Sequence, residues 1–90
     1  MNDLTAIRRE IDRLDDILIN TLVARLQASE QVARYKEAYG LPVLNREREL
    51  EILEKVAAQS GNLSPYCTRL YETIFAVSRD FQKDLMTEGF

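Results

Sequence analysis

The sequence contains no histidine, and this absence excludes several large groups of catalytic sites at once. Without histidine there is no serine–histidine relay, no imidazole general base and no imidazole ligand for zinc. The single cysteine, Cys67, cannot form a disulfide within the chain, and we expect it to be a small buried hydrophobic residue. We therefore expect no metal, no cofactor and no covalent intermediate in any reaction that this chain catalyses.

Long apolar runs and basic clusters are also missing. No apolar stretch approaches the roughly 20 residues of a membrane span, and the N-terminus lacks the charged and then apolar pattern of a signal peptide. The chain has 12 Lys and Arg against 15 Asp and Glu, a net charge of −3, and no basic run suited to nucleic acid. We therefore expect a cytoplasmic protein with no nucleic-acid or membrane partner, folded as a single domain over residues 1–90.

Glycine and proline are scarce, with 3 and 2 copies, and neither occurs between residues 3 and 39. In that stretch apolar residues recur every three or four positions, which predicts one helix from Asp3 or Thr5 to Tyr39. Gly40 is placed to end this helix, and Pro42 prevents its continuation.

Two further helices are predicted after this break, and no strand alternation is visible. Asn45 suits the N-cap of a second helix that ends near Gln59, and residues 60–62 are expected to form a loop. Ser64 suits the N-cap of a third helix, with Pro65 in its first position. The apolar stripe of the third helix consists of Leu70, Ile74, Val77, Phe81 and Leu85. The predicted fold is all-α, with three helices and a long first helix.

The length of the first helix bears on assembly. A helix of about 36 residues is about 54 Å long, whereas a compact monomer of this size is roughly 30 Å across. Half of the helix therefore needs apolar cover from elsewhere, and the simplest cover is an antiparallel second copy in a homodimer. A kinked helix that folds back is the alternative, but no proline or glycine is available to bend it.

Three cations, Arg8, Arg25 and Lys36, lie among the apolar positions of this first helix. A buried guanidinium such as that of Arg25 is costly without an anion, and no acid in the same row supplies one. Arg25 and Lys36 are about three turns apart on nearly one face, so one small anion could contact both. Arg8 is about 25 Å from Arg25 along the axis and could reach such a site only from a second copy.

The other helices add a few polar residues beside apolar faces: Arg48, Glu49, Ser78 and Gln82. Taken singly, each is most simply a surface residue, and Glu49 could pair with Arg48 or with an arginine of the first helix. Together they offer positive charge and hydrogen-bond donors without a nucleophile or a metal-ligand set. This combination suits a small dianionic substrate in a unimolecular reaction, catalysed by holding a reactive conformer and by donors placed where negative charge develops.

At these residues the sequence resembles the all-helical (AroQ-class) chorismate mutases. The match runs in order over nearly the whole chain. Its segments are Ile7–Asp15, Ala24-Arg25, Val32–Lys36, Pro42-Val43, Arg46–Glu49, Tyr71–Phe75 and Ser78–Gln82. The resemblance implies an intertwined homodimer of three-helix protomers with two active sites. It also implies the Claisen rearrangement of chorismate to prephenate, in the biosynthesis of phenylalanine and tyrosine.

The resemblance also implies roles for individual residues at the two carboxylates of the substrate. Arg25 and the partner subunit's Arg8 would bind the carboxylates, and Ser78 would help to hold one of them. Lys36 would contact a carboxylate and the ether oxygen.

The remaining implied roles concern the ether oxygen and the ring hydroxyl. Gln82 would donate to the ether oxygen as the carbon–oxygen bond breaks, and Arg48 would support the electrostatics of the site. Glu49 would accept from the ring hydroxyl with help from position 45. Related sequences carry aspartate where this chain has Asn45, and an asparagine can still accept through its side-chain carbonyl.

Two other functions remain open at this stage. An isochorismate pyruvate-lyase on the same scaffold would also bind a dicarboxylate, although the segment Arg46–Glu49 favours the mutase because it supplies a group for the C4 hydroxyl. A non-catalytic helical dimerisation module would explain the long amphipathic helix but not Arg25 in its apolar row.

Overall fold

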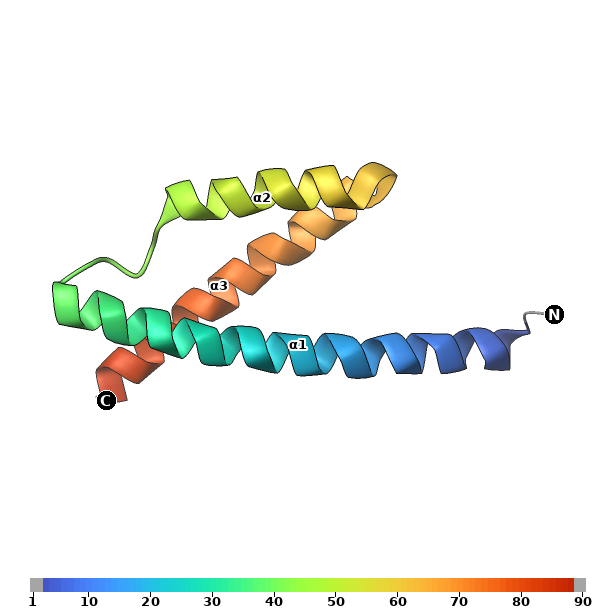
Figure 1. Ribbon diagram of the computed structural model, residues 1–90, viewed down its shortest axis with the longest axis horizontal. Helices are drawn as coiled ribbons and strands as arrows, with labels where there is room; N and C mark the ends of the chain where they lie inside the picture. The colour runs from blue at the N-terminus through green and yellow to red at the C-terminus, as the bar shows by residue number, and fades with distance from the viewer. Residues whose placement is uncertain (1–2, 89–90) are drawn as a thin grey trace.

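A long helix, α1 (Leu4–Tyr39), is the main element of the computed structural model, which describes residues 3–88 (Figure 1). Asp3 caps its start, because the Oδ1 atom accepts a hydrogen bond from the backbone N–H of Ala6 at 2.8 Å. Gly40 ends it in the left-handed region, with φ of 64°, where glycine carries no Cβ penalty. The helix is unbroken, so the prediction of one long helix is confirmed and the folded-back alternative is wrong.

The second helix, α2 (Arg46–Ser60), begins where the sequence predicts. The side chain of Asn45 accepts a hydrogen bond from the backbone N–H of Arg48 at 3.1 Å, which confirms Asn45 as the N-cap. Glu47 and Glu49 lie in the first turn, where negative charge is favourable next to the helix dipole.

The connection after α2 differs from the prediction. Residues 60–62 do not form a loop, because Ser60 completes α2 and a 3-10 turn, η1 (Gly61–Leu63), leads directly into α3 (Ser64–Glu88). Gly61 has φ of 56° and ψ of −128°, a conformation open to glycine that reverses the chain at one residue. Ser64 is not an N-cap, because its backbone is already helical, with φ of −56° and ψ of −36°.

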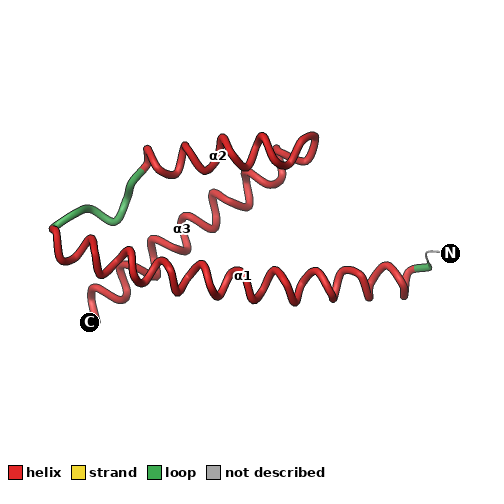
Figure 2. The backbone as a smooth tube through the Cα atoms, in the orientation of Figure 1, coloured by secondary structure: helices red, strands yellow, loops and turns green. Residues whose placement is uncertain are grey.

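The helices form an open arrangement in which α3 is the central element. α1 packs against α3, and α3 packs against α2. α1 and α2 are joined by an extended linker, residues 40–45, and make no close backbone contacts within residues 3–88 (Figure 2). The N-terminal half of α1 projects beyond the other helices (Figure 1). The radius of gyration is 16.4 Å, compared with about 12 Å for a compact chain of this length.

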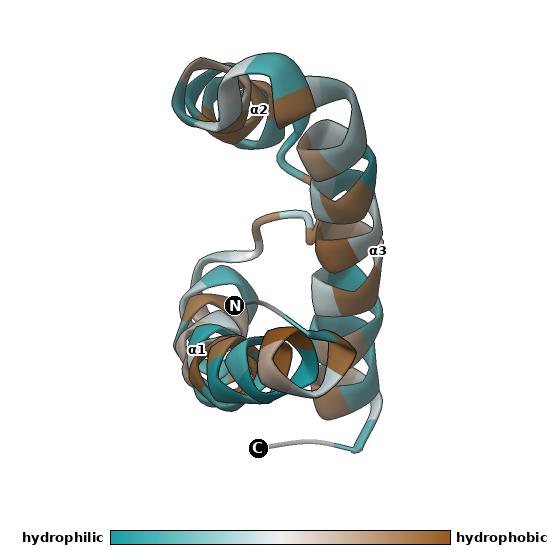
Figure 3. Cartoon of the chain, turned by 90° about the vertical axis from the view of Figure 1, so that its right-hand side faces the viewer, coloured by the Kyte–Doolittle hydropathy of each residue, from teal (hydrophilic) through white to brown (hydrophobic). Residues whose placement is uncertain are grey.

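Apolar side chains remain exposed along much of the surface. On α1 the exposed large apolar residues are Leu4, Ile7, Ile11, Leu14, Ile17, Leu18, Ile19, Val23 and Val32. Figure 3 shows hydrophobic and hydrophilic segments alternating along each helix. The buried apolar residues of the described chain are Ala33, Val56 and Phe75, which is a small core for a domain of this size.

The apolar stripe predicted for α3 is partly buried, at Ile74, Phe81 and Leu85. Leu70 is 65% exposed and Val77 is 47% exposed, whereas Phe75, Ser78 and Gln82 are buried. The three buried residues are spaced three and four positions apart, so they form one row of the helix. Ile74 and Val77 lie beside this row and line a second cavity with Leu22 and Leu26 of α1. Polar side chains thus share the interior of the chain with apolar ones.

The all-helical class is confirmed, since residues 3–88 contain no strand. Within that range no helix is both long and apolar enough to cross a membrane. Cys67, expected to be buried, is only partly buried and forms no disulfide.

Candidate functional site

A cavity of about 320 Å³ lies between the C-terminal half of α1, the start of α2 and the C-terminal half of α3. Its volume is at the lower end of the range of small-molecule pockets. Of the eight residues predicted from the sequence, all except Arg8 line it: Arg25, Lys36, Asn45, Arg48, Glu49, Ser78 and Gln82. Residues singled out in the sequence, by their spacing or by the resemblance, therefore converge on one cavity from three segments of the chain.

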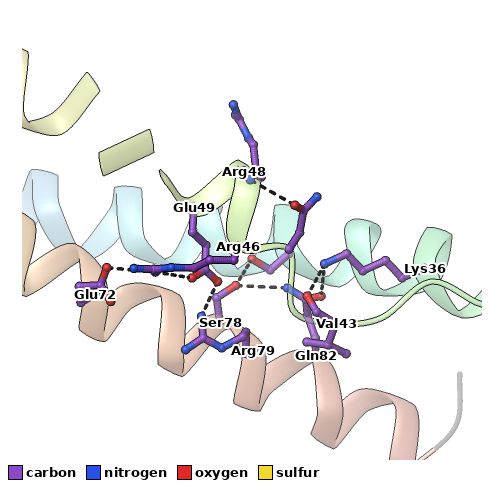
Figure 4. Close-up of polar contacts among 11 residues, drawn as sticks. Lys36, Val43, Arg46, Arg48, Glu49, Glu72, Ser78, Arg79 and Gln82 are labelled. Atoms are coloured by element: carbon purple, nitrogen blue, oxygen red, sulfur yellow. Dashed lines mark hydrogen bonds and ion pairs between the residues drawn. The ribbon is translucent and has the colours of Figure 1, made fainter. Parts of the chain in front are cut away.

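Lys36 and Gln82 meet at one end of this cavity (Figure 4). The Nζ atom of Lys36 donates to the backbone carbonyl of Val43 at 2.6 Å and approaches Oε1 of Gln82 at 3.5 Å. Burial lowers the pKa of Lys36 below its ordinary value of 10.5, and the nearby charge of Glu49 partly opposes this shift. An anion in the cavity would favour the charged form of this amine and so oppose the lowering of its pKa, which makes Lys36 suited to bind one.

A chain of hydrogen bonds fixes the buried polar groups beside Lys36. Ser29 and Ser78 share a hydrogen bond between their Oγ atoms at 2.8 Å, and Nε2 of Gln82 donates to Oγ of Ser78 at 3.4 Å. The amide of Gln82 is held from both ends, because its Oε1 atom faces Lys36. One N–H of this amide is not used in these contacts, and the long bond to Ser78 is readily exchanged for a better acceptor.

Glu49 forms the opposite wall and is 8% exposed. Its Oε1 atom accepts from Arg46 at 3.1 Å, and its Oε2 atom accepts from Arg79 of α3 (Figure 4). Arg46 also pairs with Glu72 at 3.2 Å. The expected pairing of Glu49 with Arg48 or with an arginine of α1 is wrong. Adjacent helix residues point in different directions, whereas Arg46 lies three positions away on the same face.

Arg25 stands against aromatic rings and not against a carboxylate. Its Cζ atom lies 5.9 Å from the ring centroid of Tyr71 and 5.8 Å from that of Phe75, within the range of a cation–π contact. No ion pair to Arg25 is formed within residues 3–88. Arg48 makes only an exposed contact with Glu51 at 4.0 Å, which contributes little. Both guanidinium groups are therefore available to an anion in the cavity.

Arg8 is not part of this cavity. It lies in the projecting N-terminal part of α1 and is exposed. Its separation from Arg25 by about 25 Å along the same helix prevents a shared ligand within one chain. The structure therefore leaves its predicted role dependent on a second copy.

Three polar contributors to the cavity were not predicted from the sequence: Ser29, the carbonyl of Val43, and Arg79. Ser29 lies one helical turn after Arg25, so the i,i+4 rule could have placed it on the same face. Arg79 lies three residues before Gln82 and could have been found in the same way. The carbonyl of Val43 carries no sequence signal, because every residue has one.

The cavity offers binding and electrostatics rather than a proton relay. It contains several cations and an amide donor, and no buried side-chain nitrogen or oxygen of the described chain lacks a hydrogen-bond partner. No group of three or more residues that could hold a metal ion occurs in residues 3–88. Such a site can bind a small anion tightly and stabilise negative charge that develops within it.

Comparison with known protein families agrees with this geometry. The sequence model of the family described as chorismate mutase type II matches residues 7–83 of this chain. No solved structure gives a significant match.

Individual relatives are similar over most of this chain. A 4-amino-4-deoxychorismate mutase of Streptomyces venezuelae is 30% identical over 76 residues, which are 81% of this chain and 74% of that protein. The T-protein of Enterobacter agglomerans is 41% identical over 98% of this chain, and a bifunctional chorismate mutase/prephenate dehydratase of Buchnera aphidicola is 32% identical over 97% of it. The chain spans only 24% and 23% of the length of these last two relatives.

Proposed function

Because this chain belongs to the chorismate mutase type II family, we propose that it catalyses the rearrangement of chorismate to prephenate within the cavity described above. Chorismate mutases are isomerases. The observation that carries the proposal is the convergence of three cations, Arg25, Lys36 and Arg48, with the buried amide of Gln82 around one cavity of small-molecule size. A dicarboxylate substrate supplies the negative charge that balances these three cations.

The charge balance of the cavity supports a dianionic ligand. The one carboxylate in its wall, that of Glu49, is already engaged by Arg46 and Arg79. The charges of Arg25, Lys36 and Arg48 are therefore left for the substrate, with Arg25 and Ser78 placed for one carboxylate and Lys36 for the other. The aromatic rings under Arg25 hold the guanidinium in position without neutralising it.

The chemistry needs no proton transfer, which agrees with a site that has no histidine. As the ether carbon–oxygen bond breaks, a carbon–carbon bond forms within the same molecule, and negative charge builds on the ether oxygen. Lys36 and Gln82 donate hydrogen bonds to that oxygen, and the cavity wall holds the substrate in a reactive conformer. Both donors lie at the cavity before the substrate arrives, Lys36 held by Val43 and Gln82 by a long bond to Ser78 that a better acceptor can replace, so little reorganisation is needed.

The active form proposed is an intertwined homodimer of three-helix protomers. The projecting part of α1 exposes apolar residues such as Ile7, Ile11 and Leu14 by 45–49%, and an antiparallel second copy of α1 would cover them. The same packing brings the partner subunit's Arg8 toward the cavity of this chain. Arg8 cannot reach the cavity of the chain to which it belongs. Arg8 then adds a further cation to the carboxylate site.

The direct test is the loss of chorismate absorbance with purified protein, with prephenate identified as the product. Parallel incubation with isochorismate separates the mutase from a pyruvate-lyase, which would release pyruvate. Chorismate turnover with no release of pyruvate from isochorismate is expected. A correctly folded protein that leaves chorismate unchanged would refute the proposal.

Subunit mixing tests the shared site. Arg8→Ala and Arg25→Ala are each expected to be nearly inactive alone. If sites are shared, a mixed dimer has one intact site and one that carries both substitutions, so mixing restores up to about half of the activity per dimer. Absence of recovery after verified subunit exchange would show that Arg8 does not complete the partner's site.

A further inference from the structure

The contacts of Glu49 suggest that this cavity selects its substrate by charge. Each oxygen of the Glu49 carboxylate accepts from a different guanidinium, that of Arg46 on the same helix and that of Arg79 on α3. A carboxylate has about four lone-pair sites, so Glu49 can still accept one hydrogen bond from a ligand. Arg46 also pairs with Glu72 at 3.2 Å, so Arg79 is the cation that offsets the negative charge of Glu49, and the four linked side chains present no net negative charge to a ligand.

Asn45 adds a second feature to the same wall. Its Oδ1 atom is occupied by the backbone N–H of Arg48, and the side chain lines the cavity. The amide nitrogen of Asn45 therefore remains as a donor. A hydroxyl group can donate to Glu49 and accept from Asn45 at the same time, whereas a protonated amine has no lone pair and can only donate.

We propose that Arg79, acting through Glu49, makes the cavity selective for a neutral hydroxyl group at C4 of the substrate and against a cationic amine at that position. The inference rests on the proposed function, in which Glu49 accepts from the ring hydroxyl. It concerns a choice that arises among relatives, because one similar protein is named a 4-amino-4-deoxychorismate mutase. Arg79 is a positioning residue in this proposal, since it contacts Glu49 and not the substrate.

The expected size of the effect follows from the geometry. A charge a few ångströms from a cationic amine changes its binding by a factor of ten or more at the effective dielectric of protein interiors. The side chain of Arg79 is 27% exposed, so solvent reduces its influence. We expect removal of this charge to shift the preference toward the amine by about tenfold.

The first measurement uses the unmodified protein with chorismate and with 4-amino-4-deoxychorismate, and compares kcat/KM for the two. Chorismate is expected to be preferred by about tenfold or more. Equal or greater efficiency with the amine would overturn the inference while leaving a mutase activity in place. Failure to convert either compound would instead refute the proposed function.

The second measurement uses variants at position 79. Arg79→Gln keeps a donor for Glu49 but removes the charge, and should raise the ratio of amine to hydroxyl efficiency about tenfold. Arg79→Lys retains the charge and should keep a ratio close to that of the unmodified protein. Arg69→Gln, on the same helix but outside the cavity, is the matched control and should leave kcat/KM unchanged for both substrates.

These variants separate a charge effect from a structural one. A structural defect lowers kcat/KM for both substrates together and leaves their ratio unchanged, so an unchanged ratio in folded Arg79→Gln overturns the inference. If that variant does not fold, Asn45→Asp provides a second test, because aspartate also caps a helix but adds negative charge and removes the donor. Asn45→Asp should raise the ratio of amine to hydroxyl efficiency, as Arg79→Gln does. A ratio that stays constant in this variant would contradict the proposed selectivity.

Discussion

Replacing Gln82 by glutamate tests the proposed role of its amide with almost no change in shape. Gln82 is 5% exposed, lies 3.5 Å from the amine of Lys36 and donates to Ser78. An amide donates at every pH near neutrality, whereas a carboxylic acid donates only while it is protonated. Gln82→Glu therefore changes a permanent donor into one controlled by pH.

The expected loss of kcat in Gln82→Glu can be estimated from the burial of Gln82. With 5% exposure, water has little access to replace the lost donor. Loss of one donor to a developing negative charge costs about 2.7–4 kcal/mol, or about 10²- to 10³-fold in kcat. The introduced carboxyl titrates from an ordinary pKa of about 4.3, which burial raises and Lys36 lowers. We expect activity at pH 8 to fall by that factor and to rise at least tenfold between pH 8 and pH 5.

The assay is the rate of chorismate loss from pH 5 to pH 9, with circular dichroism at each pH to verify folding. The rate of the unmodified protein should be nearly constant over this pH range. Gln82→Met is the matched control, because it has a similar shape, no donor and no titration, and should be slow at every pH. Full activity of Gln82→Glu at pH 8 would refute the donor role of Gln82.

Three further predictions concern the same buried cluster. Lys36→Ala should cost at least about 2.7 kcal/mol of barrier, and near-normal turnover of this variant would remove Lys36 from the mechanism. Burial lowers the pKa of Lys36 below 10.5 in the free protein, so its charge, and with it kcat/KM, should be lost as the pH rises toward a midpoint below 10.5. A pH–rate profile that stays flat beyond 10.5 would contradict this. Ser29→Ala removes a buried partner of Ser78 and should lower stability by about 1 kcal/mol, or Tm by roughly 4–8 °C. An unchanged Tm would mean that water replaces the lost hydroxyl.

Local signals in the sequence predicted the helices, and together with the resemblance they predicted half of the residues that line the cavity. The N-cap at Asn45 and the end of α1 at Gly40 were predictable because capping depends on a few neighbouring residues. Assignment to the chorismate mutases from short ordered segments is confirmed by the family match over residues 7–83. The loop predicted at 60–62 was wrong because a single residue with a positive φ, Gly61, reverses the chain between the end of α2 and the 3-10 turn that leads into α3.

Contacts between helices were not predictable in the same way. The hydrogen bond between Ser29 and Ser78 joins residues 49 positions apart, and that between Arg79 and Glu49 joins residues 30 positions apart. Both depend on how α3 crosses the other helices, which no local spacing determines. The periodicity of α3 located an apolar stripe that is partly buried, but it did not show that Ser78 and Gln82 are buried beside it, since periodicity locates a stripe and does not say what covers it.

The interior of the single chain and its candidate site are the same set of residues. Within residues 3–88 four of the buried side chains are polar, namely Ser29, Glu49, Ser78 and Gln82, and the cavity takes the place of an apolar centre. Because apolar burial is the main source of stability, such a chain needs to cover the apolar face of α1 from outside. In the proposed dimer that cover is a second α1, and it carries Arg8. The requirement for stability and the requirement for a complete carboxylate site are then met by the same contact.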